Sequence, residues 1–266
     1  MVNNCSNQHT KPKGGTLNGY SKISGRGPHR RNRAAVDTWI VNFGSNAGNA
    51  ASAASIRTIL FNTRDIFNIA HKFQMTMEAV INEYAETYIG SASKIPVVHM
   101  VPRGQNAVCP FLKDGLCSIH DCKPTVCALF PLGRVVVNAQ ALESGLENGP
   151  VEVKYMLVDT DCGSRMRVNT VREWLARFGI PEHDEFFLLW SKLTAMLHRM
   201  IRELEEHHVS EGTLDMFWNA IFFTLYLDYD TSAEFFPQFQ RASERLISLC
   251  QGVAEVGKIL PGSETT

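Results

Sequence analysis

Four of the seven cysteines in this chain lie within nineteen residues, and no other feature restricts its fold as strongly. They are Cys109, Cys117, Cys122 and Cys127, and the other three cysteines are scattered far from them. Thiolates are soft ligands for zinc and for iron–sulfur clusters, and the ligands of one metal must converge on one point. The backbone between them must therefore turn tightly, which the flexible Gly115 allows.

The meaning of these cysteines depends on whether the chain meets an oxidising environment. Residues 1–15 lack the apolar stretch of a secretory signal. No apolar run approaches the roughly 20 residues that a membrane helix needs. We therefore expect a cytoplasmic protein without a membrane span, whose thiols stay reduced. In that setting clustered cysteines indicate metal binding or catalysis rather than a disulfide framework.

The spacing within the cluster leaves two other interpretations open. The intervening stretches of seven, four and four residues differ from the Cys-x2-Cys knuckle of common zinc fingers. The cysteines could be small buried hydrophobic residues, or Cys127 could be a nucleophile with His120 as its base. We favour metal ligation, because a lone nucleophile does not explain three other nearby cysteines. For His120 we favour a packing or outer-shell role over direct ligation.

The charges of the chain are unevenly distributed. Residues 1–34 carry seven basic side chains and no acidic one, so the remaining residues carry a net charge of −8. A basic tail can contact nucleic acid, a membrane or an acidic partner. Because this tail has few large apolar residues, we favour a solvated, disordered terminus over nucleic-acid contact. We leave open whether the chain binds an unidentified protein partner.

Apolar periodicity predicts a mostly helical α+β fold. Helices are predicted over 62–73, from Thr76 to Gly90, from Thr170 to Gly179, over 185–207, and near 213–227 and 232–252. Strands are predicted at 95–101, 135–137 and 151–158, with the last two able to form a hairpin. Pro96 favours an edge position for the first of these strands.

The same patterns suggest how the chain is divided. We expect a disordered basic tail at 1–34 and a cysteine-cluster domain at 35–190. A helical C-terminal extension over 191–266 is expected to pack on that domain.

From Cys109 the sequence CPFLKDGLCSIH…KPTVCALFPLGR resembles the zinc- or iron-chelating cysteine-cluster family of the YkgJ type, named for a CxxCxxCC pattern. The resemblance covers residues 60–190 and includes the DI-x2-IA segment that begins at residue 65. It implies that Cys109, Cys117, Cys127 and Cys162 hold an iron–sulfur cluster or zinc. The family usually has another residue type at the position of Cys122, which is therefore expected to be a bystander.

The chain departs from this family in one respect. Members usually carry a further cysteine group upstream, but here the segment NFGSNAGNAASAASIRTILFNTRD has none. Either one metal is held by fewer thiolates, or the site has decayed while the fold survives.

Two further hypotheses concern the activity. The resemblance extends to flagellin lysine N-methylases, which makes a protein-modifying enzyme the second hypothesis. However, no glycine-rich loop follows a strand to hold adenosylmethionine. The third hypothesis is a non-enzymatic interaction protein with structural zinc. The sequence assigns no reaction.

Overall fold

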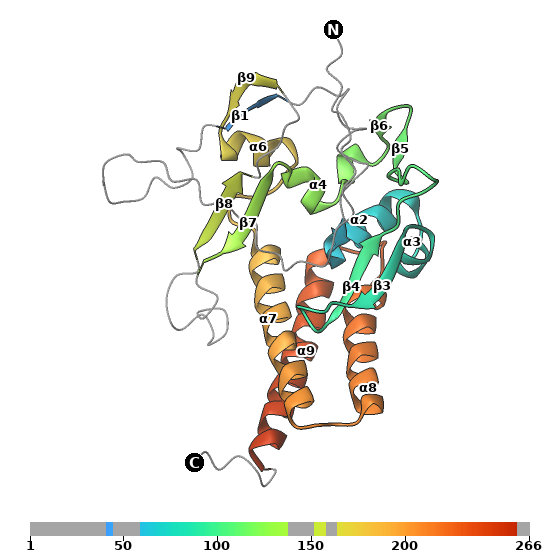
Figure 1. Ribbon diagram of the computed structural model, residues 1–266, viewed down its shortest axis with the longest axis vertical. Coiled ribbons are helices and arrows are strands. Elements are labelled where there is room, and N and C mark those ends of the chain that lie inside the picture. Colours follow the sequence, from blue (N-terminus) through green and yellow to red (C-terminus); the bar gives the residue numbers. More distant parts are fainter. Residues whose placement is uncertain (1–40, 45–58, 138–151, 158–163, 260–266) are drawn as a thin grey trace, which may run out of the picture. The chain divides into compact units, whose positions relative to one another are not determined.

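The computed structural model describes residues 41–44, 59–137, 152–157 and 164–259 (Figure 1). These residues form an α+β fold that is mostly helical, as the apolar periodicity predicts. Within these ranges no helix combines the length and the apolar character that crossing a membrane requires.

The helices, in chain order, are α2 (Thr63–Phe73), α3 (Met77–Tyr84), the 3-10 helix η2 (His120–Cys122), α4 (Thr125–Leu129), α6 (Val171–Arg177), α7 (Glu185–Glu206), α8 (Glu211–Phe222), the π-helical segment η4 (Phe223–Leu227) and α9 (Phe235–Ile259). The strands are β1 (Val41–Gly44), β2 (Leu60–Phe61), β3 (Ala85–Ile89), β4 (Pro96–Met100), β5 (Leu112–Lys113), β6 (Leu116–Cys117), β7 (Leu132–Val136), β8 (Val153–Leu157) and β9 (Ser164–Asn169). All strand pairs are antiparallel.

Local capping explains where the first two helices begin. The Asn62 side chain accepts a hydrogen bond from the Asp65 amide, and the Asp65 carboxylate accepts one from the Asn62 amide, which forms a capping box for α2. The Thr76 side chain accepts from the Ala79 amide at the start of α3. Both predicted helix starts are confirmed.

The predicted helix from Thr76 to Gly90 is wrong beyond Tyr84. Residues 85–89 form β3, which pairs along its whole length with β4. Three of these residues, Thr87, Tyr88 and Ile89, are β-branched or aromatic and suit a strand. The apolar spacing of this short stretch fits both a helix and a strand. Pairing with β4 determines that it forms a strand.

The expected edge position of Pro96 is also wrong, because β4 is the central strand of the sheet β2–β4–β3. Pro96 is the first residue of β4 and lies opposite Ile89 of β3. On its other side β4 pairs with β2 only at Val98 and His99. The proline therefore lies beyond the end of β2, where the missing N–H interrupts no ladder.

The middle of the chain forms a smaller core of its own. β7 and β8 pair as the predicted hairpin, although the residues that connect them lie largely outside the described ranges. Leu129, Leu132, Val171, Trp174 and Leu175 form an apolar cluster between this hairpin, α4 and α6. The predicted start of α6 at Thr170 is confirmed by a capping box with Glu173.

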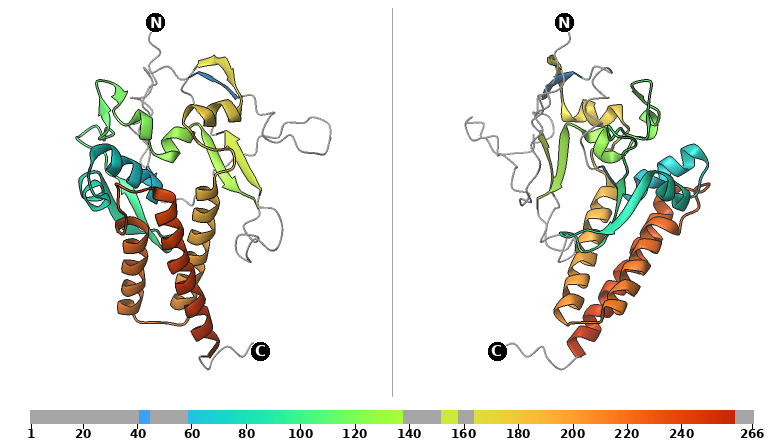
Figure 2. Two further views of the ribbon diagram at one scale, coloured as in Figure 1. Left: turned by 180° about the vertical axis from the view of Figure 1, so that it is seen from behind. Right: turned by 45° about the vertical axis from the view of Figure 1, so that its right-hand side comes forward.

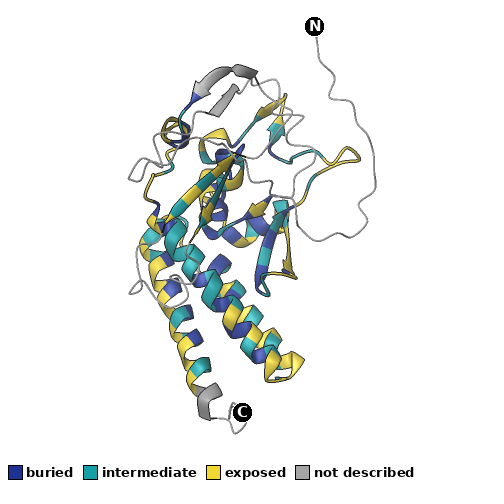
Figure 3. Ribbon diagram, turned by 60° about the vertical axis from the view of Figure 1, so that its left-hand side comes forward, coloured by how far each residue is buried: buried dark blue, intermediate teal, exposed yellow. Residues whose placement is uncertain are grey.

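The helical half shares its core with the cysteine-bearing half. Buried residues of segments 59–119 and 186–250 belong to one apolar cluster. The helix α7 passes without interruption through residue 190, where the predicted domains meet. It runs beside α9, and a loop leads from the end of α7 to α8, which runs in the opposite direction to α7 (Figures 1 and 2). Buried and exposed residues alternate around each long helix, as expected for helices that cover a core (Figure 3).

Candidate metal centre

The cysteine loop, residues 109–127, is folded by short elements: the strands β5 and β6, the 3-10 helix η2 and the helix α4. β5 and β6 form a hairpin in which Leu112 lies opposite Cys117. The chain reverses at Asp114 and Gly115, where φ is 51° and 77°. An Asp-Gly pair suits this two-residue turn, because both positions need a positive φ. Gly115 therefore has the turn-forming role that the sequence predicts.

Two further turns complete the cysteine loop. Cys122 ends η2, and Cys127 lies inside α4. These two thiols and those of Cys109 and Cys117 are half-buried and pack against the same apolar core. The Cys109 Sγ atom lies 3.9 Å from the Sδ atom of Met100 on β4. The described cysteines of the predicted ligand set thus lie against one core.

The thiols of the cysteine loop influence one another electrostatically. The pKa of Cys127 is raised to about 12, chiefly by burial, with smaller raising contributions from Cys109, Asp65 and Cys117 and a lowering contribution from Lys123. Burial is also the main cause that raises the pKa of Cys109, with a smaller contribution from Cys117. Without a cation, ionising one of these thiols in such apolar surroundings is therefore unfavourable.

Cys122 differs from these thiols in its electrostatic neighbours. Burial raises its pKa to about 11, and the next cause is Asp121 rather than another cysteine. Cys117 contributes less, and Lys72 acts in the opposite direction. The structure therefore brings Cys122 near the predicted ligands, but its strongest electrostatic neighbours are an acid and a base on the surface.

By donor type, the residues of the cysteine loop fit a thiophilic metal. Several free, half-buried thiols in one short loop are the donor type that zinc and iron–sulfur clusters use. Among the described residues, however, no group of three or more His, Cys, Asp or Glu side chains has an arrangement ready to hold a metal ion. Binding would therefore draw the thiols together, so that metal binding is coupled to ordering of the loop.

Cys162 and His120, the other residues that the sequence associates with the metal site, differ in what the structure shows of them. Cys162, the predicted fourth ligand, lies outside the described residues. The ring of His120 packs against the ring of Phe178, with 5.9 Å between centroids. This contact agrees with the packing role favoured for His120.

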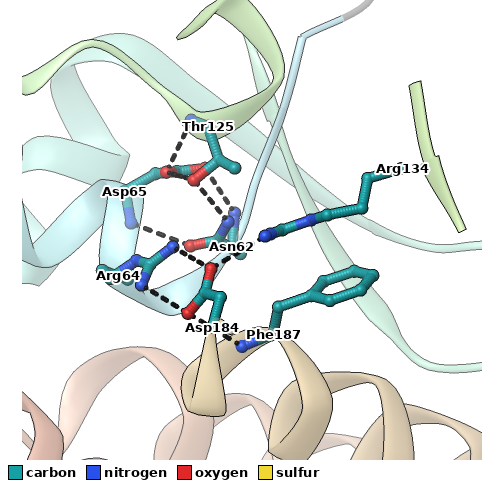
Figure 4. Close-up of polar contacts among 7 residues, drawn as sticks. All are labelled: Asn62, Arg64, Asp65, Thr125, Arg134, Asp184 and Phe187. Atoms are coloured by element: carbon teal, nitrogen blue, oxygen red, sulfur yellow. Dashed lines mark hydrogen bonds and ion pairs between the residues drawn. The ribbon is translucent and has the colours of Figure 1, made fainter. Parts of the chain in front are cut away.

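The turn that carries Cys127 is held by a buried carboxylate on another helix. One oxygen of Asp65, Oδ1, accepts hydrogen bonds from the backbone amide of Thr125 at 2.8 Å and from its hydroxyl at 2.7 Å. The Asn62 side-chain amide donates to the same hydroxyl at 3.3 Å. Asp65 and Asn62 thus connect the start of α2 to the start of α4 (Figure 4).

A second buried carboxylate lies beside this network. Asp184 accepts a bidentate pair of bonds from Arg64, both 3.0 Å long, and a further bond of 3.0 Å from Arg134. It also caps α7 by accepting from the Phe187 amide (Figure 4). The guanidinium of Arg134 lies 3.7 Å from the centre of the Phe187 ring. The hydrogen bonds of Asp184 therefore join α2, β7 and α7.

Sequence reasoning missed both carboxylate networks. From the sequence, Asp65 is identified only as the first residue of the DI-x2-IA segment. Asp65 meets Thr125 across 60 residues, and Arg64 meets Asp184 across 120. Periodicity within one segment does not reveal contacts between distant segments. The available signal was that polar residues stand at the start of each of the helices concerned.

Comparison of the chain with protein-family models, with curated proteins and with solved structures finds no match. The resemblance to the cysteine-cluster family therefore rests on the motifs around the cysteines and stays a prediction.

Proposed function

We propose that this chain is a metal- or iron–sulfur-cluster-binding protein in which Cys109, Cys117, Cys127 and Cys162 are the thiolate ligands. One observation carries the proposal: the first three thiols are half-buried against the same apolar core. A shared cation would offset the cost of ionising these partly buried thiols.

The chain's own residues supply the shape of the site. The hairpin of β5 and β6 returns Cys117 toward Cys109, and α4 carries Cys127. The apolar core behind these thiols excludes water from one side of the site. A bound zinc ion would supply a tetrahedral cross-link, whereas an iron–sulfur cluster would supply one-electron redox chemistry.

The test is metal analysis of protein purified without oxygen. Iron, zinc and acid-labile sulfide are measured together with the visible spectrum, because an iron–sulfur protein is brown and a zinc protein is colourless. Serine replacements at 109, 117, 127 and 162 should each reduce the metal content sharply. Cys122→Ser is the matched control, since it removes a neighbouring thiol of the same loop and should leave the metal content unchanged.

The outcomes separate the parts of the proposal. Wild-type protein that holds neither metal nor cluster, even after anaerobic reconstitution, would disprove the function. A fully metallated Cys162→Ser protein would remove that residue from the ligand set. Loss of metal from Cys122→Ser would show that Cys122 is a ligand.

A further inference from the structure

The helix that carries Cys127 lacks the features that stabilise a helix on its own. α4 has only five residues. The residue that precedes it, Pro124, occupies the capping position but has no side chain that can accept a hydrogen bond from the helix. A single helical turn is unstable in isolation, because its nucleation cost is not recovered by enough hydrogen bonds. Contacts from outside the helix must therefore fix the direction in which Cys127 points.

Asp65 supplies the missing cap from another helix. Its Oδ1 atom accepts from the Thr125 amide, one of the first amides of α4, which have no partner within the helix. The Thr125 hydroxyl donates to the same oxygen, while Oδ2 accepts from the Asn62 amide at 3.1 Å. Asp65 is only 3% exposed, so water cannot readily replace these bonds. Because α2 fixes the position of Asp65, these bonds also fix the position of Thr125, the first residue of α4.

The other end of α4 is also held by a distant residue. The indole N–H of Trp174 on α6 donates to the carbonyl oxygens of Ala128 and Leu129, both at 3.1 Å. Cys127 lies between these two attachments. A change at either attachment would therefore rotate or loosen the turn that presents the thiol.

We propose that Asp65 is a positioning residue for the metal site, holding the first turn of α4 so that the Cys127 thiol faces the thiols of Cys109 and Cys117. The inference rests on the proposed function. Asp65 lies outside the proposed ligand set, and its role is exerted through Thr125. Outer-shell groups of this kind commonly change metal affinity when they are removed.

Asp184 provides a control of unusual similarity. It is a second buried carboxylate, it lies beside the same helix α2, and it also caps a helix. Its hydrogen bonds go to Arg64, Arg134 and the Phe187 amide, which belong to α2, β7 and α7. If loss of any buried carboxylate disturbed the metal site only by destabilising the fold, then removal of Asp184 would disturb it at least as much as removal of Asp65.

The experiment is titration of metal-free protein with Co²⁺, which reports thiolate ligation through its charge-transfer and d–d absorption. Asp65→Ala, Asp184→Ala and wild type are compared, with affinity measured by chelator competition and corrected for the folded fraction from circular dichroism. Asp65→Ala should bind Co²⁺ about 10–100-fold more weakly and lose thiolate charge-transfer intensity. Asp184→Ala should keep the wild-type affinity and spectrum per folded molecule.

A double-variant cycle tests whether Asp65 acts through Cys127. In a Cys127→Ser background, Asp65→Ala should cause no further loss of Co²⁺ affinity. If Asp65→Ala does not fold, Thr125→Val removes only the hydroxyl contact and should shift affinity and spectrum in the same direction by a smaller factor.

The outcomes distinguish this inference from the proposed function. Wild-type protein that binds neither Co²⁺ through thiolates nor, after anaerobic reconstitution, an iron–sulfur cluster contradicts the proposed function; if only the cluster binds, the variants are compared by their cluster content. Wild-type binding that is unchanged in folded Asp65→Ala or Thr125→Val, or reduced equally by Asp184→Ala, overturns the positioning role alone.

Discussion

Asp65 within α2 and Asp184 beside it are both buried carboxylates, yet their pKa values shift in opposite directions. Burial is the largest influence on each and favours the protonated form. At Asp65 it prevails over the hydrogen bonds from Thr125 and Asn62, so the pKa is raised. At Asp184 the hydrogen bonds and charges of Arg64 and Arg134 together outweigh it, so the pKa is lowered.

The difference shows that the charge of the partners decides how a buried carboxylate behaves. Three neutral donors orient Asp65 but do not fully replace its hydration. Two guanidinium groups both orient Asp184 and neutralise it. We therefore expect Asp184 to matter mainly for stability and Asp65 mainly for the geometry of the cysteine loop.

The largest expected effect is the loss of Asp184. Asp184→Ala leaves the guanidinium groups of Arg64 and Arg134 in an apolar site without their carboxylate partner. We expect the free energy of unfolding to fall by about 3–5 kcal/mol, as for other broken buried ion pairs. Urea denaturation of the metal-free protein measures this change. A loss below about 1 kcal/mol, the size typical of exposed pairs, would show that water reaches the arginines.

Acid should remove part of the same stabilisation. Because the pKa of Asp184 is lowered on folding, its contribution is complete above its ordinary value of 3.8 and is lost as the pH falls through the lowered value. Asp65, whose pKa is raised, contributes in the opposite sense: its contribution is present below 3.8 and is lost as the pH rises through the raised value.

These opposite signs can be measured on metal-free protein by denaturation at a series of pH values. As the pH falls into the acid range, the unfolding free energy of Asp184→Ala should decrease less steeply than that of the wild type. The curve for Asp65→Asn should lose less stability than the wild type as the pH rises above 3.8. Parallel curves for variants and wild type would contradict the assigned pKa directions.

A smaller loss is expected when the hydroxyl that binds Asp65 is removed. Thr125→Val keeps the backbone bond to Asp65 but deletes the bond of 2.7 Å from Oγ1. Removing one partner of a buried acceptor costs about 1–3 kcal/mol, so the unfolding free energy of the metal-free protein should fall within that range. Thr125→Ser, which keeps the hydroxyl, is the matched control and should retain most of the stability.

The smallest effect should come from a helix cap that is local and exposed. Thr76 caps α3 with its own side chain, at 3.1 Å from the Ala79 amide. Thr76→Ala should lower the unfolding free energy by about 1 kcal/mol. Its Co²⁺ affinity should equal that of the wild type, because this cap does not touch the cysteine loop. A weakened Co²⁺ affinity would mean that general loss of stability, rather than loss of the Asp65 contact, disturbs the site.

Several parts of the fold follow from the sequence because neighbouring residues determine them. The caps at Asn62, Thr76 and Thr170 involve residues three positions apart, so the starts of three helices can be read directly. The Asp114-Gly115 turn is equally local. The metal ligands themselves stay a prediction, and Cys162 lies outside the described residues.

The strand β3 marks the limit of such reasoning. Residues 85–89 continue an apolar spacing that fits a helix, yet they form a strand because β4 offers them a complete ladder of hydrogen bonds. The position of Pro96 in a central strand likewise depends on where β2 ends. Both outcomes depend on a partner strand, which a pattern within one segment does not specify.

By itself the sequence determined the helical character of the chain, the local caps and turns, and the gathering of cysteines in one short loop, since each depends on residues close in the chain. Only the tertiary structure decided that Asp65 holds the turn of Cys127 and that Asp184 joins Arg64 to Arg134. The physical reason is that a buried carboxylate must find donors wherever the packed elements bring them, and here these donors lie 50 to 120 residues away.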